Sequence, residues 1–360
     1  MKRWQETTRI FERLARLGAE GRRAALATVV RIQGSAYRRP GAKLLVEDDG
    51  AMTGSVSGGC LEQHVREVGL TVGREGVPRL LYYDTDDTAP WGLGLGCNGK
   101  VDVFVQPAPS ADASEAAAAL RAGLGGEEPF AVATLVSESP PGGRALVVGG
   151  DGLRAGSTGD RSLDRAMSAR AAEALARRES RYEEIGSTQV FTEVLEPPPQ
   201  LLIAGAGDDA IPLAATAAAI GFRVTVADHR SPFLTPERFP DAWQLVLGRP
   251  EAEMDSVTLG PSAHAVTMTH SYEGDREWLR RLLRSEVRYI GVLGPRVRTQ
   301  KLLAELGAAD CERIFGPVGL DLGGEGPEQV ALSIAAELLA FWSRRSPQPL
   351  REREGPIHGG

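Results

Sequence analysis

The stretch LLIAGAGDDA, residues 201–210, has a pattern that predicts the fold of the C-terminal half of this chain. Its apolar start predicts a strand, and Gly205, Gly207 and Ala210 form a GxGxxA turn that leads into an alanine-rich helix. Asp228 ends the next predicted strand, 21 residues after Gly207, which is the spacing of an acid that binds a ribose hydroxyl. Because strand, turn, helix, strand and acid follow in this order, the sequence predicts a Rossmann fold.

Short apolar strands and helices continue to alternate beyond this motif. The alternation predicts an α/β fold with a parallel, doubly wound sheet. We place this Rossmann-like domain at residues 197–345 and expect the polar, Pro- and Gly-rich residues 346–360 to form a flexible tail. Further strands of the sheet are predicted at FRVTVAD, WQLVLG, HAVTMTH and YIGVLG.

The N-terminal half predicts a second α/β domain with two glycine-rich loops. Residues 1–107 contain GSVSGGC at 54–60 and GLGLGCNG at 92–99, each with one cysteine and each between regular elements. Binding chemistry usually lies on such loops. Residues 108–196 predict a helix, two strands and a second helix, and we expect them to belong to the same domain. Three consecutive prolines, Pro197–Pro199, then form a stiff linker.

The composition argues against several classes of protein. With 41 basic and 48 acidic residues, the formal charge of −7 provides no basic field for nucleic acid or an anionic membrane surface. The charged N-terminus lacks the apolar core of a signal peptide, and no apolar run approaches the ~20 residues of a membrane span. Three cysteines are too few for a disulfide scaffold. We therefore expect a cytoplasmic protein with free thiols.

Two acidic residues, Asp208 and Asp209, follow the second glycine of the turn and argue against a tightly bound dinucleotide. A carboxylate ~6 Å from a phosphate charge costs roughly 3 kcal/mol at an effective dielectric of about 20, and screening leaves roughly a tenfold to hundredfold loss of affinity. Alternatively, either carboxylate caps the helix and occupies the amides that a phosphate needs. We expect weak NAD(P) binding at most, and we expect His229 and Arg230 to be solvated.

Six stretches of the chain together resemble the XdhC/CoxI family of xanthine dehydrogenase accessory factors. The family usually has a histidine directly after the glycines of the turn, where this chain has Asp208, and residues 108–196 are largely outside the resemblance. The six stretches are ATVVRIQGSAYRRPGAKLLV (27–46), GSVSGGCLE (54–62), GLGLGCNGKVDVFVQP (92–107), MTHSYEGD (268–275), YIGVLGPRVRTQKLL (289–303) and PVGLDLGGEGPEQVALSIAAEL (317–338).

This resemblance implies a cytoplasmic protein that binds molybdenum cofactor, the molybdopterin that carries molybdenum. It implies that the protein helps the cofactor to acquire its terminal sulfur and delivers it to a xanthine dehydrogenase-like apoenzyme. The expected partners are that apoenzyme, a sulfur donor of the cysteine desulfurase type and further copies of the chain in a homo-oligomer. Such a protein is a cofactor-binding chaperone without turnover of its own.

The first glycine-rich loop suits a ligand that presents a phosphate. Gly54, Gly58 and Gly59 can offer unobstructed backbone amides to an anion. The hydroxyl groups of Ser55 and Ser57 are further candidate donors.

The cysteines of the two loops are candidate contacts to molybdenum. Cys60 comes just before a predicted helix, whose dipole favours a thiolate, and Cys97 lies in the second loop. A thiolate is the form that binds a soft metal or carries sulfur. Alternatively, Cys60 is a small apolar residue packed under a turn. We expect Cys311, in the polar stretch AADCER, to have no role.

Candidate residues of the Rossmann half are the turn glycines Gly205 and Gly207, Asp228, His270 and Arg296. His270 follows a predicted strand, and the carboxyl ends of parallel strands are where open α/β sheets bind ligands. Arg296 follows the LGP turn and is a candidate contact to an anion.

Charged residues near the first loop allow two interpretations. Arg38, Arg39 and Lys43 flank a Pro-Gly turn and either clamp a phosphate or are solvated turn charges. Glu62 and His64 lie on the predicted helix, where we expect a partner of the helix dipole and a surface residue.

Two other functions stay open beside the cofactor chaperone. One is an NAD(P)-dependent oxidoreductase that uses the Rossmann half, against which Asp208 argues. The other is a regulatory or scaffold protein that binds no cofactor, against which the intact Cys60 and Cys97 argue. The sequence contains no zinc-ligand pattern, nucleophile elbow or Walker loop.

Overall fold

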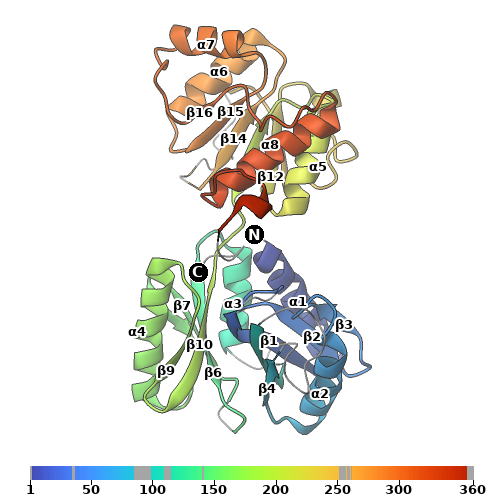
Figure 1. The fold of residues 1–360 in the computed structure, drawn as a ribbon, viewed down its shortest axis with the longest axis vertical. Coiled ribbons are helices and arrows are strands. Elements are labelled where there is room, and N and C mark those ends of the chain that lie inside the picture. Colours follow the sequence, from blue (N-terminus) through green and yellow to red (C-terminus); the bar gives the residue numbers. More distant parts are fainter. Residues whose placement is uncertain are drawn as a thin grey trace. The chain divides into compact units, whose positions relative to one another are not determined.

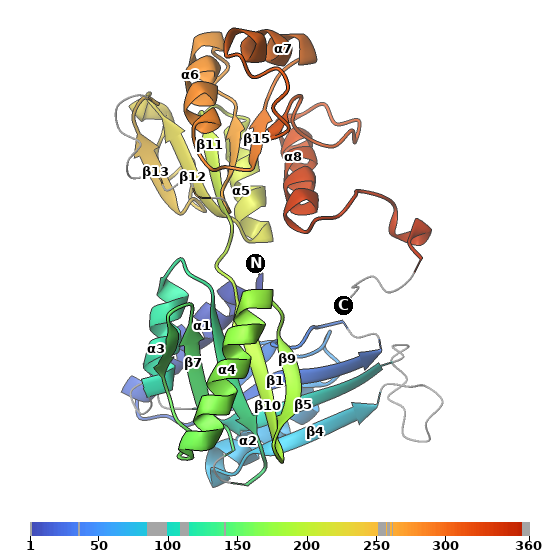
Figure 2. The same ribbon diagram turned by 90° about the vertical axis from the view of Figure 1, so that its left-hand side faces the viewer.

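The structure of this chain is a computed structural model that describes residues 2–34, 37–84, 99–108, 115–139, 142–250, 257, 260 and 262–354. The chain divides into two compact units, residues 2–197 and 198–360 (Figures 1 and 2). The division falls in the run Pro197–Pro199, where fixed φ angles and missing N–H groups disfavour a continuing helix or sheet interior. None of the helices among the described residues is long and apolar enough to cross a membrane.

The first sheet of the N-terminal unit is antiparallel, with strand order β3-β2-β1-β5-β4. Alternate β1 side chains face opposite sides of the sheet, and Ala25, Ala27 and Val29 pack under α2. Helix α2 ends at Gly76, whose φ of 74° suits glycine. The bounds are β1 (Ala24–Gly34), β2 (Lys43–Glu47), β3 (Met52–Gly54), α2 (Glu62–Glu75), β4 (Arg79–Asp84) and β5 (Gly99–Pro107).

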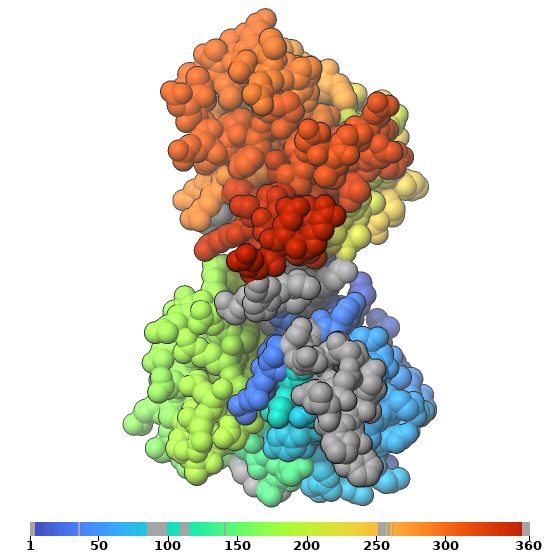
Figure 3. Space-filling view, viewed as in Figure 1, coloured from blue at the N-terminus to red at the C-terminus, as the bar shows by residue number. Residues whose placement is uncertain are grey.

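The second sheet of this unit is also antiparallel, with strand order β8-β7-β6-β10-β9. Helix α4 covers its outer face and forms part of the surface of the unit (Figures 1 and 3). Helices α1 and α3 pack with residues of both sheets in a shared core. The bounds are α1 (Lys2–Ala19), α3 (Glu115–Gly125), β6 (Phe130–Val136), β7 (Ala145–Gly149), β8 (Gly152–Ala155), α4 (Arg161–Arg177), β9 (Arg181–Ile185) and β10 (Thr188–Leu195).

The C-terminal unit is the predicted doubly wound parallel sheet, with strand order β13-β12-β11-β14-β15-β16. Helices α5 and α8 lie side by side on one face, and α6 and α7 pack on the other (Figure 1). The bounds are β11 (Gln200–Ala204), α5 (Ala210–Ile220), β12 (Arg223–Asp228), β13 (Gln244–Leu247), β14 (His264–Thr267), α6 (Tyr272–Leu283), β15 (Tyr289–Val292), α7 (Arg296–Glu305), β16 (Ile314–Phe315) and α8 (Pro327–Trp342).

The order of strands in this sheet reverses between β11 and β14. The chain runs outward from β11 to β12 and β13 and then returns to place β14 on the other side of β11. A crevice for ligands is expected at the carboxyl ends of two such strands. In this chain the segments there are residues 205–209 and 268–271.

Candidate functional site

The first glycine-rich loop joins β3 to α2 and is anchored on β2 at its start. Ser55 donates its backbone N–H to the carbonyl oxygen of Lys43 at 2.8 Å. Gly54 has a φ of 96°, and a Cβ there would lie 2.3 Å from the same carbonyl oxygen. Only glycine therefore fits this position without a shift of the backbone.

Glu62, in the first turn of α2, holds the loop in its folded shape. Its carboxylate accepts hydrogen bonds from the Ser57 N–H at 2.9 Å, from the Ser55 hydroxyl at 2.8 Å and from the Ser57 hydroxyl. Burial raises the pKa of the Glu62 carboxyl, but the hydrogen bonds from Ser57 and Ser55 outweigh burial and lower it to about 2. The carboxylate is therefore charged at neutral pH.

This network corrects the expectation that Ser55 and Ser57 present their hydroxyl groups to a ligand. Both hydroxyl groups point at Glu62, and the Ser57 oxygen also accepts the N–H of Gly59 at 3.1 Å. The sequence signal for this role is weak. Glu62 lies five and seven residues after its serine partners, whereas a capping box places the acid three residues after the serine.

The outer part of the loop remains open to a ligand. Gly58, Gly59 and Cys60 are exposed, and among the described residues the amides of Gly58 and Cys60 have no hydrogen-bond partner. Gly59 has a φ of 118°, and no atom lies within 4 Å of the position of an added Cβ. The ring of Tyr37 lies against Gly58, 3.5 Å from where its Cβ would be.

The cysteines differ in what the structure shows of them. Cys60 is a free, exposed thiol two residues before the first residue of α2, so the alternative that it packs under a turn is wrong. Cys311 is a free thiol of intermediate exposure. Cys97 lies outside the described residues. Within the described part of the chain, no group of three or more His, Cys, Asp and Glu side chains is arranged to hold a metal ion.

Of the three charged residues that flank the Pro-Gly turn, Arg38 and Lys43 are paired within the protein, and Arg39 is exposed. Arg38 forms an ion pair with Glu6. Lys43 is buried and forms an ion pair with Glu193 of β10, so the interpretation of Lys43 as a solvated turn charge is wrong. His64 is exposed, and its Nδ1 lies 2.9 Å from the hydroxyl oxygen of Tyr83.

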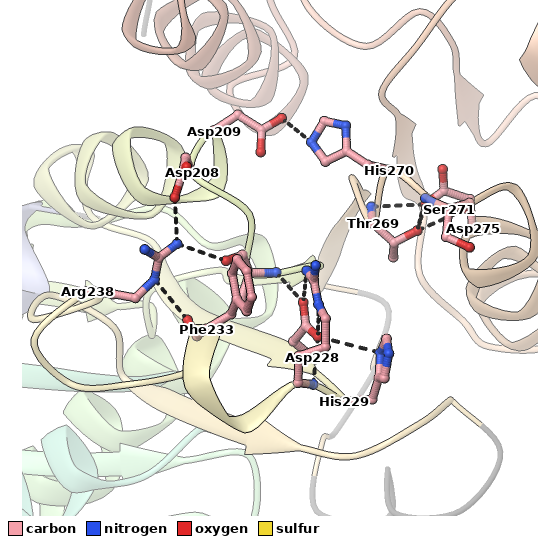
Figure 4. A network of polar contacts seen from close by, with 12 residues as sticks. Asp208, Asp209, Asp228, His229, Phe233, Arg238, Thr269, His270, Ser271 and Asp275 are labelled. Carbon is pink, nitrogen blue, oxygen red and sulfur yellow. Dashed lines mark hydrogen bonds and ion pairs between the residues drawn. The ribbon is translucent and has the colours of Figure 1, made fainter.

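Asp228, which the sequence predicts to bind a ribose hydroxyl, is buried and makes its contacts within its own unit. It accepts the N–H of Ala206 at 2.7 Å and pairs with Arg230 at 2.8 Å (Figure 4). Burial raises the pKa of the Asp228 carboxyl, but the hydrogen bonds from Arg230 and Ala206 outweigh burial and lower it to about 2. The ion pair of Arg230 with Asp228 corrects the expectation that Arg230 is solvated.

The two acidic residues after Gly207 do not cap α5. Asp209 occupies the N-cap position but makes no capping hydrogen bond, and its Oδ2 lies 2.7 Å from Nε2 of His270. Asp208 pairs instead with Arg238 at 2.9 Å (Figure 4). The helix amides are therefore not occupied by either carboxylate, and the interpretation of these residues as caps is wrong.

His270 joins the two segments at the switch point. It has a φ of 57°, and its ring lies close to Gly207, whose added Cβ would be 3.5 Å from the ring. The pair of Asp209 and His270 thus spans the crevice between the carboxyl ends of β11 and β14. Gly205, another predicted site residue, also lies in this crevice. It packs against the segment after β14, since a Cβ added to Gly205 would lie 2.5 Å from the Met268 carbonyl oxygen.

Arg298, which the sequence did not single out, is bound to a buried carboxylate near the switch point, whereas Arg296 stays a candidate contact to an anion. The Nη1 atom of Arg298 lies 2.6 Å from the fully buried carboxylate of Asp275. That carboxylate also accepts the N–H and hydroxyl of Thr269. Arg296 is exposed at the first residue of α7. No local signal separated the two arginines, which are two residues apart.

A cavity of about 500 Å³ lies beside these groups in the C-terminal unit. Asp228, Arg230, Thr269 and Ser271 are among the residues that line it. A cavity of this size at the switch point of a doubly wound sheet is typical of a ligand site.

Two family models match most of the described chain. The XdhC Rossmann domain matches residues 201–338, and the XdhC and CoxI family matches residues 17–84 and 124–186. The matches therefore include both the loop that holds Cys60 and the switch point.

Similar proteins and a solved structure agree with these matches. A protein of Bacillus subtilis (strain 168), named as a probable subunit of xanthine dehydrogenase, is 32% identical over 318 residues, which cover 88% of this chain and 92% of that protein. The molybdenum cofactor insertion chaperone PaoD of Escherichia coli (strain K12) is 35% identical over 92 residues, 25% of this chain and 28% of that protein.

A crystal structure described as a xanthine dehydrogenase from Bacillus halodurans has a TM-score of 0.75 and 30% identity. The match covers 94% of this chain and 96% of that chain. With family models that match both units and a relative similar over nearly its whole length, this chain belongs to the XdhC and CoxI family.

Proposed function

We propose that this protein binds molybdenum cofactor at the first glycine-rich loop and assists its insertion into a xanthine dehydrogenase-like enzyme. The names of two relatives, a molybdenum cofactor insertion chaperone and a probable component of xanthine dehydrogenase, support a role in the maturation of such an enzyme. The observation that carries the proposal is the exposed Cys60 beside Gly58 and Gly59 at the open end of the loop.

The residues of this loop fit the chemistry of the cofactor. When bound, the cofactor supplies a phosphate, a flat pterin and a molybdenum atom held by sulfur. The amides of Gly58 and Cys60, which have no partner within the described part of the chain, are donors suited to the phosphate. The Cys60 thiol, as a thiolate, is a soft ligand suited to the metal. The hydrogen bond from Ser57 to Glu62 fixes the shape of the loop, and Gly58 and Cys60 stay exposed.

Three further parts of the function rest on family membership and are also proposals. The protein supports sulfuration of the cofactor, it receives sulfur from a donor of the cysteine desulfurase type, and it acts as a homo-oligomer in the cytoplasm. We propose Cys97 as a second contact to molybdenum. In the Rossmann half we propose a site around Gly205, Gly207, Asp228 and His270 that binds NAD(P) weakly at most.

Replacement of Cys60 tests the proposal on the full chain. Protein purified from a molybdenum-replete host is passed through gel filtration, and molybdenum and oxidised pterin per chain are measured by metal analysis and fluorescence. We expect Cys60→Ser to retain at least tenfold less of both than wild type, because a hydroxyl binds a soft metal poorly at nearly unchanged volume. Cys311→Ser is the matched control and should retain as much as wild type. If the two variants retain equal amounts of molybdenum and pterin, Cys60 does not take part in binding the cofactor.

A further inference from the structure

A cavity of about 590 Å³ lies inside the N-terminal unit, between its two sheets. Its walls come from alternate residues of facing strands, among them Leu26 and Val30 of β1 and Val132 of β6. The volume lies in the range of ligand-binding pockets, which is roughly 300–1,000 Å³. This cavity is separate from the switch-point cavity, which belongs to the other unit.

The polar groups in the cavity exceed what the packing of two sheets requires. Lys43 of β2 and Glu193 of β10 line it, and their ion pair joins the two sheets although both side chains are buried. A buried ion pair often stabilises a fold no more than a well-packed apolar pair does, because both charges lose their hydration. Thr28 and Thr134 add hydroxyl groups to the same lining. Apolar walls with a few convergent polar groups are typical of a ligand site.

A further polar group in the lining, the side chain of Gln106, has an atom without a hydrogen-bond partner among the described residues. Gln106 lies in β5, and the atom is its buried Oε1. Gly143 leaves room for it, since an added Cβ there would lie 3.0 Å from Oε1. A buried acceptor without a donor destabilises the fold, because the solvation it loses on burial is not replaced. A ligand with an N–H group would supply the missing donor.

The charges of the lining favour a neutral ligand. Lys43 and Arg144 are its two cationic residues, and Glu115 and Glu193 are its two acidic residues, so the lining has no net charge. Lys43 is already paired with Glu193, and Arg144 donates to the Thr158 carbonyl oxygen at 2.9 Å. An anionic ligand would have to compete with Glu193 for Lys43.

From these observations we infer that the cavity is a binding site for a neutral nitrogen heterocycle. Such a molecule presents apolar ring faces to the two sheets, where Phe104 and Phe191 are among the lining residues. The N–H groups at its edge suit the acceptor on Gln106. The exposed residues Gly76, Glu115 and Ser157 lie at the rim, where the molecule can enter. This inference does not rest on the function proposed for the loop.

The test uses free pterin, 2-amino-4-hydroxypteridine, as a neutral fluorescent probe of the full-length protein. We expect wild type to bind pterin and Gln106→Leu to bind it at least tenfold more weakly, because leucine keeps the volume and removes the acceptor. Gln63→Leu, on the exposed face of α2, is the matched control and should bind pterin as wild type does. Thr134→Phe fills the cavity and should abolish binding, which keeps the test decisive if Gln106→Leu does not fold.

The outcomes separate this site from the loop. Cys60→Ser should bind free pterin as wild type does, even where it loses molybdenum cofactor. Wild type that fails to bind pterin at millimolar concentration would overturn the inference, as would equal binding by wild type and a folded Thr134→Phe. Tighter binding of decanoate than of pterin would overturn the assignment to neutral heterocycles.

Discussion

Glu62 is the residue on which the shape of the first glycine-rich loop depends. We expect Glu62→Gln to lower the free energy of unfolding by ~2 kcal/mol at neutral pH, because hydrogen bonds to a charged acceptor become neutral ones. The retention of molybdenum cofactor should fall with it. Chemical denaturation and metal analysis measure the two effects.

The pH dependence of the Glu62 effect has a definite sign. The folded pKa of about 2 is below the ordinary value of 4.5, so the carboxylate stabilises the fold above about pH 4.5. That contribution disappears as the pH falls towards 2. The difference between wild type and Glu62→Gln should therefore shrink over this window. Glu75→Gln, in the last turn of α2 with a side chain 45% exposed, is the control and should show little difference at any pH.

From the surroundings of Asp208 in the structure we expect it to repel a bound anion less than its position in the sequence suggests. Its side chain is 84% exposed and pairs with Arg238, so both solvent and a cation reduce its repulsion of a phosphate. We expect wild type to bind NAD(H) weakly and Asp208→Asn to bind it less than tenfold more tightly, measured by calorimetry. Asp208→His, which restores the residue usual in the family, should behave similarly. A hundredfold gain in either variant would show that the charge of Asp208 controls the site.

At the scale of elements, a close approach of α2 to β2 fixes the helix that begins after the loop. An added Cβ at Gly69 would lie 2.9 Å from the side chain of Val46. We expect Gly69→Ala to destabilise the N-terminal unit by ~1–3 kcal/mol through overpacking. Gly73→Ala, in the same helix, meets its nearest atom at 3.4 Å and should be neutral or slightly stabilising. Denaturation curves in which both variants are equally stable would contradict this packing.

The elements that the sequence predicted are those with a clear hydrophobic period. The strands and helices of the C-terminal unit follow the predicted alternation, and its glycine turn indicated the switch point. The hairpin of β9 and β10 was not predicted. β9, RYEEI, is mostly charged, and β10 is buried at six consecutive positions, Val190–Leu195, so neither shows the alternation of a half-buried strand.

At the scale of the whole molecule, the sequence located the segments of the site but not the contacts within them. Gly58, Gly59 and Cys60 lie exposed on one loop, as their pattern indicated. The partner of Asp208 is 30 residues away, and the partner of Lys43 is 150 residues away. Such pairings depend on tertiary structure, and a single sequence carries no local signal for them.

The binding of molybdenum cofactor at the loop that contains Cys60 can be measured on the intact protein. The measurement is native mass spectrometry of the full chain purified from a molybdenum-replete host. We predict a species heavier than the bare chain by the mass of molybdopterin with molybdenum, and we predict that this species is at least tenfold depleted in Cys60→Ser. Only the bare mass in wild type, or equal amounts of the heavier species in wild type and Cys60→Ser, would show that the cofactor is not held at this loop.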